Sequence, residues 1–144
     1  MIDRVFIDTN VLVYAFLEND KARHSAAVRL LCGMMGKEAF ISTQVMGEIY
    51  SALTKNGVGH ELITRYLSEL EEDINICSVT PDTIKKCLSL KQKYLYSYWD
   101  SLILASSVES ECTIVYSEDM QHGQVIEQSL TIMNPFFRLL EKTV

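Results

Sequence analysis

The segment that most constrains the fold is residues 5–14, where an apolar run is interrupted once, by Asp8, Thr9 and Asn10. A short, wholly apolar run bounded by polar residues is typical of a buried β-strand. We therefore predict a strand over residues 2–7, followed by a helix. In open α/β sheets, an acid directly after such a strand lies at the carboxyl edge, where these folds bind ligands. Taken alone, Asp8 fits a helix N-cap as well as it fits a ligand-binding residue.

The rest of the chain alternates between short apolar runs and segments of helical periodicity. Further strands are predicted over residues 39–41, 74–79, 113–116 and 130–133. Helices are predicted over residues 11–17, 20–33, 42–56, 60–71, 81–94, 99–110 and 136–141. This alternation is typical of a parallel sheet with helices on both faces. We expect one α/β domain over residues 1–144, with three α/β/α layers and a mainly parallel central sheet of four to five strands.

The composition indicates an ordinary globular protein, with 48% hydrophobic and 22% charged residues and a net charge of −6. A strongly basic nucleic-acid binder is excluded, so any contact with RNA must be local. An acidic chain that handles phosphates usually needs a cation. The basic candidates for local phosphate contact are Lys55, Arg65, Lys85 and Lys86, although solvated surface positions explain them equally.

The four cysteines form no C-x-x-C pair and none lies near a histidine at zinc spacing. We expect Cys32, Cys77, Cys87 and Cys112 to act as small apolar core residues in a reducing compartment. Asp3 and Arg4 interrupt any apolar core of a signal peptide, and no stretch reaches the length of a membrane span. The sequence therefore predicts a cytoplasmic protein without a membrane partner.

Three further acids occupy positions of interest, each with an ordinary alternative. Glu48 lies at the edge of a helical apolar stripe, which is compatible with a crevice or with solvent. Asp100 shares a helix face with Ile103 in a segment predicted to be buried nearly all round, and a buried carboxylate needs a partner or a metal. Its alternative is a first-turn acid favoured by the helix dipole. Asp119 follows its strand as Asp8 does, and turn chemistry is its alternative.

In a parallel sheet, these four acids can converge at one carboxyl edge. Clustered carboxylates repel one another, so such a site requires a bound cation. Oxygen ligands favour Mg²⁺ or Mn²⁺ over zinc. A site of this kind can activate water and neutralise the charge that develops on a phosphodiester.

The residues that carry this pattern resemble the PIN-domain nucleases, and most closely the VapC-type toxins of bacterial toxin–antitoxin pairs. They are the segments 6–12, 98–103 and 116–120 together with Glu48. The resemblance covers essentially the whole chain and implies a single PIN domain that acts as a metal-dependent endoribonuclease. It assigns the catalytic and metal-binding quartet to Asp8, Glu48, Asp100 and Asp119.

The resemblance also implies supporting residues and partners. Asn10 matches an asparagine that supports the first acid, and Ser117 matches a hydroxyl residue before the last one. The implied cofactor is Mg²⁺ or Mn²⁺, and the implied partners are an RNA substrate, a cognate antitoxin and a second copy of the chain.

Other functions fit less well or remain open. A haloacid-type phosphatase needs a second acid where this chain has Asn10, and a dinucleotide-binding fold needs a glycine-rich first turn. No nucleophile elbow supports Ser/His/Asp catalysis. Two alternatives stay open: an RNA-processing PIN nuclease without a toxin role, and a non-catalytic PIN module that binds RNA or protein.

Overall fold

The computed structural model describes residues 3–34 and 36–141. The strands are β1 (Arg4–Ile7), β2 (Glu38–Ser42), β3 (Asn75–Cys77), β4 (Ile114–Tyr116), β5 (Val125–Ile126) and β6 (Leu130–Met133). The helices are α1 (Thr9–Phe16), α2 (Lys21–Cys32), α3 (Thr43–Lys55), α4 (His60–Asp73), α5 (Pro81–Tyr94), α6 (Tyr98–Glu109) and α7 (Phe137–Glu141). The predicted strand and helix order is confirmed. Ile2, in the first predicted strand, lies outside the described residues.

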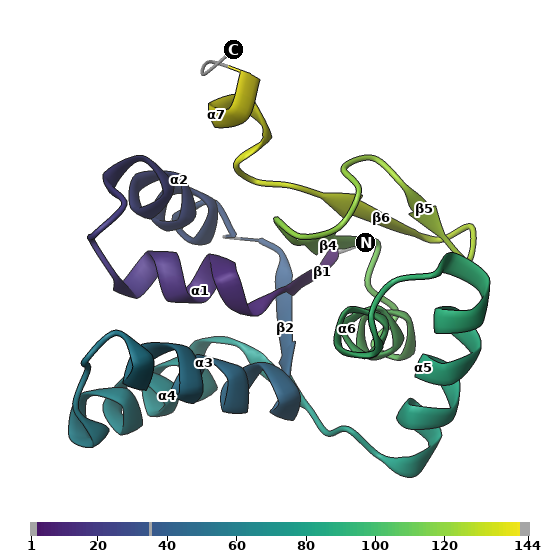
Figure 1. Ribbon diagram of the computed structural model, residues 1–144, viewed down its shortest axis with the longest axis horizontal. Helices are drawn as coiled ribbons and strands as arrows, with labels where there is room; N and C mark the ends of the chain where they lie inside the picture. Colours follow the sequence, from purple (N-terminus) through teal and green to yellow (C-terminus); the bar gives the residue numbers. More distant parts are fainter. Residues whose placement is uncertain (1–2, 35, 142–144) are drawn as a thin grey trace.

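The strands form one sheet in the order β3-β2-β1-β4-β6-β5, with every pairing parallel except that of β5 with β6. Helices α1 to α4 lie on one side of the sheet, and α5 and α6 lie on the other (Figure 1). The predicted three-layer α/β/α fold is therefore confirmed. Strands β2 and β3 follow β1 in sequence on one side of it, and β4 lies on the other side of β1, so the direction of strand addition reverses there. This reversal opens a crevice at the carboxyl ends of β1 and β4, where open α/β sheets bind ligands.

Among the described residues the sheet has six strands instead of the predicted four to five, because β5 forms a short hairpin with β6. Two residues of the connecting turn, Glu127 and Gln128, have positive φ angles of 51° and 63°. Hairpin turns with positive φ usually carry Asn-Gly or Asp-Gly, and this turn carries neither. Lys86 and Lys93 instead hold the carboxylate of Glu127, at 3.2 and 2.7 Å.

Side-chain caps fix where the helices that carry the candidate site begin. Asp8 caps α1, and the Ser42 hydroxyl caps α3 by accepting from the N–H of Val45. The Ser97 hydroxyl caps α6 by accepting from the N–H of Asp100. Because each cap satisfies an otherwise unpaired N–H group, the sequence sets the start of each helix locally.

The core consists of the apolar faces of β1, β2, β4 and β6 and the inner stripes of the helices. Within the described residues, none of the helices combines the length and apolarity needed to cross a membrane. The cysteine prediction holds for Cys87 and Cys112, which are buried, but is wrong for Cys32, which is exposed near the end of α2. All four cysteines are free thiols.

Candidate metal centre

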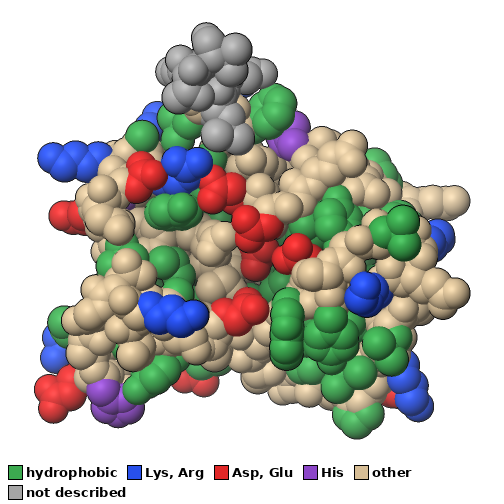
Figure 2. Space-filling model, in the orientation of Figure 1, with side chains coloured by type: hydrophobic (Ala, Val, Ile, Leu, Met, Phe, Trp, Pro, Cys, Tyr) green, Lys and Arg blue, Asp and Glu red, His purple; other side chains and the backbone are tan. Residues whose placement is uncertain are grey.

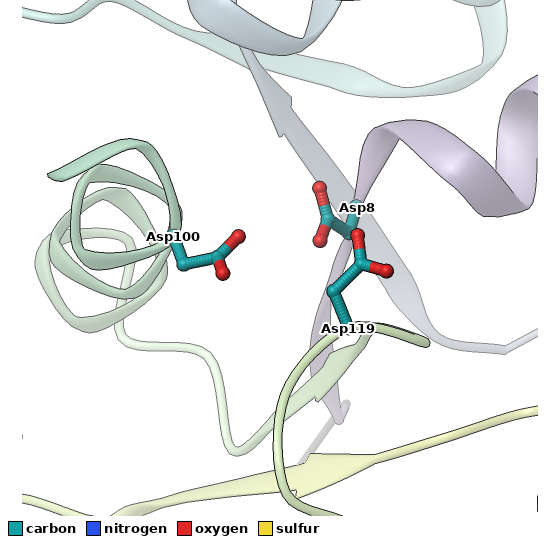
Figure 3. Close-up of side chains that lie close together, drawn as sticks. All are labelled: Asp8, Asp100 and Asp119. Atoms are coloured by element: carbon teal, nitrogen blue, oxygen red, sulfur yellow. The ribbon is translucent and has the colours of Figure 1, made fainter. Parts of the chain in front are cut away.

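Three aspartates from three separate elements converge at the crevice between β1 and β4. Asp8 follows β1, Asp119 lies in the loop after β4, and Asp100 lies in the first turn of α6. One carboxylate oxygen from each of them lies within 4.8 Å of the other two. Figure 3 shows Asp100 pointing from α6 toward the other two side chains. The predicted convergence of these three acids at one sheet edge is therefore observed.

Asp8 is the buried member of the cluster and uses both carboxylate oxygens. Its Oδ1 accepts a hydrogen bond of 2.7 Å from the N–H of Thr9, and its Oδ2 accepts one of 2.8 Å from the hydroxyl of Ser117. The pKa of Asp8 is raised from 3.8 to about 7, mainly by burial; the charges of Asp100 and Glu48 act in the same direction, and the two hydrogen bonds oppose them. Asp8 is thus the N-cap of α1 and also a member of the acid cluster.

Asp100 is half-buried at the wall of the crevice. Burial raises its pKa above the ordinary value, the nearby charges of Asp119 and Glu48 act in the same direction, and the hydrogen bond with Ser97 opposes them. The prediction that its helix is buried nearly all round holds from Ser101 to Ser107 but is wrong at the first turn, where Trp99 is 60% exposed. The first turn reaches past the sheet edge, which leaves Asp100 open to the crevice.

Asp119 is the exposed member of the cluster and is held by Asn10. The side-chain amide of Asn10 donates a hydrogen bond of 2.9 Å to Oδ2 of Asp119. Asn10 was predicted to support the first acid, Asp8, and the structure corrects this. The two strand-end turns support each other crosswise, because Asn10 contacts Asp119 while Ser117 contacts Asp8.

The residue before Asp119 has a different partner. Glu118 accepts a bond of 2.7 Å from Nε of Arg23, whose guanidinium also contacts Asp20 at 3.0 Å. The sequence-based preference for Asp119 over Glu118 as a cluster member therefore agrees with the geometry. Arg23 also lies over the rings of Tyr14 and Phe136. The ion pair between Arg23 and Glu118 thus connects the loop after β4 to the first turn of α2.

Glu48, the fourth predicted acid, stands beside the three aspartates and outside the close cluster. Its Oε1 accepts a hydrogen bond of 2.6 Å from the hydroxyl of Thr9, and Gln44 lies 3.4 Å from its other oxygen. Thr9 therefore links the turn after β1 to α3. This role was missed from the sequence, where Thr9 is only the middle residue of a polar turn.

A cavity of about 470 Å³ contains all four acids. Figure 2 shows acidic side chains near the middle of this face of the molecule. Residues on one face of α3 extend the lining away from the acids and end at Lys55 and Asn56. Among the described lining residues, Lys55 is the only Lys or Arg. Arg65 and Lys85 do not line this cavity, and Lys86 is paired with Glu127.

The donor set fits a divalent cation that prefers oxygen ligands. The three clustered side chains offer only carboxylate oxygens, as Mg²⁺ and Mn²⁺ require, and no cysteine or histidine lines the described cavity. Three like charges at this spacing repel one another, and burial adds to their cost, as the raised pKa values of Asp8 and Asp100 show. A bound cation would remove both penalties.

Comparisons with known proteins agree with this architecture. The VapC20 toxin of Mycobacterium tuberculosis, which cleaves the sarcin–ricin loop, is 23% identical, with a TM-score of 0.67 over 80% of this chain and 89% of that one. A toxin–antitoxin complex from Klebsiella pneumoniae is 19% identical, with a TM-score of 0.69 over 91% and 97%. VapBC2 of Rickettsia felis, bound to a promoter DNA fragment, is 14% identical, with a TM-score of 0.65 over 91% and 99%.

The TM-scores of these three structures show a shared fold. No curated protein sequence matches the chain. The family model of the PIN domain, however, matches residues 5–126, which include every acid of the cluster and Glu48. The chain therefore belongs to the PIN-domain family.

Proposed function

We propose that this chain is a metal-dependent endoribonuclease and the toxin of a toxin–antitoxin pair. The observation that carries the proposal is the convergence of three aspartates at the carboxyl edge of a PIN fold, where the chain reverses direction across the sheet. Four free thiols support a reducing compartment, the cytoplasm, as its place of action. We further propose that residues 1–144 form one PIN domain.

The proposed cofactor is Mg²⁺ or Mn²⁺, held by Asp8, Asp100 and Asp119, with Glu48 as a further ligand or as the residue that orients water. A divalent cation at these carboxylates supplies Lewis-acid chemistry, which activates water and offsets charge on a phosphodiester. The protein contributes the positions of the ligands. Ser117 and Asn10 fix Asp8 and Asp119, and Thr9 turns the carboxylate of Glu48 toward the same cavity.

We propose hydrolysis by water over attack by the ribose 2′-hydroxyl, because a divalent cation held by the aspartates would activate water. Glu48, fixed through Thr9, is the side chain best placed to accept a proton from an attacking water. We therefore expect cleavage products with a 5′-phosphate and a 3′-hydroxyl.

Purified protein freed of any partner tests the activity on total RNA with Mg²⁺ or Mn²⁺. We expect cleavage by the wild type and a loss of at least about a hundredfold for Asp100→Asn, which keeps the side chain's shape but removes its charge. The control Asp82→Asn makes the same change at an exposed position on α5 and should cleave normally. Absence of metal-dependent cleavage, or ends carrying 2′,3′-cyclic phosphate, would contradict the proposal.

The toxin role draws support from solved relatives, several of which are toxin–antitoxin complexes. We propose an antitoxin protein and a second copy of the chain as partners. Expression in a bacterial host should arrest growth, and Asp100→Asn should relieve the arrest. Light scattering on the purified chain should report twice its mass of 16.4 kDa. Normal growth despite active nuclease would favour an RNA-processing role instead.

A further inference from the structure

A second cavity, of about 520 Å³, opens beside the acidic one. It lies where the first turns of α3 and α6 face each other, and its apolar lining comes from Val79, Trp99 and Leu102. Gly47, Glu48 and Trp99 line both cavities, so the two form a continuous surface. Its volume falls within the range of about 300–1,000 Å³ typical of small-molecule sites. In Figure 2, hydrophobic side chains lie next to the acidic ones on the side of α5 and α6.

Trp99 is the main exposed group of this second cavity. Its side chain is 60% exposed, although the residues that follow in α6 are buried. The ring of Tyr98 packs edge-on against it, with 4.9 Å between ring centroids, and Gln44 donates a hydrogen bond of 3.1 Å to its backbone carbonyl. Trp99 is thus an exposed aromatic ring on an anchored backbone, which is the arrangement used to stack single-stranded nucleobases.

Gln44 adds a polar group to the same cavity. Its amide nitrogen contacts Trp99 and Glu48, which leaves its Oε1 as the free acceptor. This oxygen is buried and has no hydrogen-bond partner among the described residues. The oxygen is covered in this structure, so a ligand N–H donor would reach it only after a turn of the Gln44 side chain, and would then satisfy an unfavourable unpaired acceptor. All four RNA bases carry an N–H donor, so this contact favours a base without fixing its identity.

We propose that this cavity binds a nucleobase of single-stranded RNA, stacked on Trp99, next to the phosphate held at the acidic site. This inference rests on the proposed function and adds a subsite to it. The continuity through Glu48 and Gly47 places a base and a phosphate of one strand on adjoining surfaces. A second copy of the chain is the competing occupant, but covering this cavity would also bury the carboxylate of Glu48.

Trp99 is the only tryptophan of the chain, so fluorescence excited selectively at tryptophan reports on this site. Titration of Asp100→Asn, which should cleave at least about a hundredfold more slowly, with single-stranded oligoadenylate and oligouridylate in Mg²⁺ separates binding from cleavage. We expect both to quench the fluorescence, and the purine to quench it more. AMP should quench at high concentration, whereas ribose 5-phosphate, which lacks a base, should not. Quenching by ribose 5-phosphate equal to that by AMP would overturn the inference.

Two variants test the same site by affinity for labelled oligoadenylate. Trp99→Leu removes the aromatic ring and should weaken binding by about 5- to 100-fold. The control Phe137→Leu makes a similar change at an exposed position on α7 and should bind normally. Gly47→Leu should also weaken binding, because a Cβ at Gly47 meets no atom within 4 Å and the side chain would extend into the cavity.

Gly47→Leu tests whether a loss of binding arises from the blocked cavity or only from unfolding of the variant. Replacing a glycine inside a helix raises helix propensity, so this variant should unfold at the same or a higher temperature while binding RNA less well. Stabilisation of Trp99→Leu by Mg²⁺ should match that of the wild type.

The possible outcomes separate the two proposals. Cleavage by the wild type with unchanged affinity in Trp99→Leu would overturn the base site and leave the nuclease intact. Base-dependent quenching without cleavage by the wild type would support the base site and contradict the nuclease proposal. A fluorescence change on dilution of the protein alone, with a halved mass for Trp99→Leu, would assign the cavity to a second copy and also overturn the inference.

Discussion

Asp8→Asn tests the electrostatics of the acid cluster in the metal-free protein. Burial raises the pKa of Asp8 in the folded chain to about 7, against an ordinary value of 3.8. Because the folded value is the higher one, folding favours the protonated carboxyl. Its stabilising contribution is therefore complete below the unfolded pKa and is lost as the pH rises through the folded pKa. The difference between the folded and unfolded pKa values of Asp8 corresponds to a loss of about 4 kcal/mol of unfolding free energy between low and high pH.

An asparagine at this position cannot ionise and so escapes that loss. Its carbonyl oxygen can still accept from the N–H of Thr9, and its amide can donate to the hydroxyl of Ser117. At about pH 8 in EDTA, we expect Asp8→Asn to exceed the wild type in unfolding free energy by roughly 2–4 kcal/mol. At about pH 5 the difference should fall by more than half, because the wild-type carboxyl is then mostly protonated in the folded chain.

Urea denaturation of the two proteins at both pH values measures this difference. Addition of Mg²⁺ at about pH 8 should reverse the order, since it stabilises the ionised wild type by binding and the variant has lost a ligand. The control Asp82→Asn should stay within about 0.5 kcal/mol of the wild type throughout, as exposed substitutions usually do. If Asp8→Asn is no more stable than the wild type at about pH 8 in EDTA, the account of the buried carboxylate is refuted.

Lys55→Ala should weaken single-stranded RNA binding and reduce its salt dependence by a slope of about 0.7, the loss expected for one phosphate contact. Fluorescence anisotropy at several salt concentrations measures this slope, and the exposed control Lys91→Ala on α5 should leave it unchanged. Asn10→Ala frees Asp119 and should weaken Mg²⁺ binding by about 10- to 100-fold, which calorimetric titration measures. Leu95 ends α5 with a φ of 66° at 82% exposure. Leu95→Asn should therefore raise the unfolding free energy by about 0.5–1 kcal/mol, because asparagine tolerates this conformation better, and urea denaturation tests it.

Local features of the site could be predicted from the sequence because local chemistry determines them. The apolar run before Asp8 fixes a strand end, and the predicted starts of α3 and α6, at residues 42 and 99, lie within one residue of the observed starts at Thr43 and Tyr98. A parallel sheet then brings acids that follow β1 and β4 to one edge. What the sequence left open was the strand order, which depends on packing between distant segments and which places β4 beside β1.

Contacts between distant residues were the main part that sequence reasoning could not supply. Asn10 and Asp119 are 109 positions apart, as are Asp8 and Ser117, and no local pattern says which hydroxyl or amide meets which acid. Trp99 was misjudged for a related reason. Apolar periodicity marks a residue as suited to a core, but whether the core reaches that turn depends on where the sheet ends.

The Asp20–Arg23–Glu118 ion-pair network links the first turn of α2 to the loop that carries Asp119. Displacement of α2 would therefore shift one side of the acid cluster. Thermodynamic linkage then applies in both directions. A partner that binds the α1–α4 layer and prefers one position of α2 must change the affinity of the acid cluster for its cation. The cation must change the affinity for that partner by the same factor.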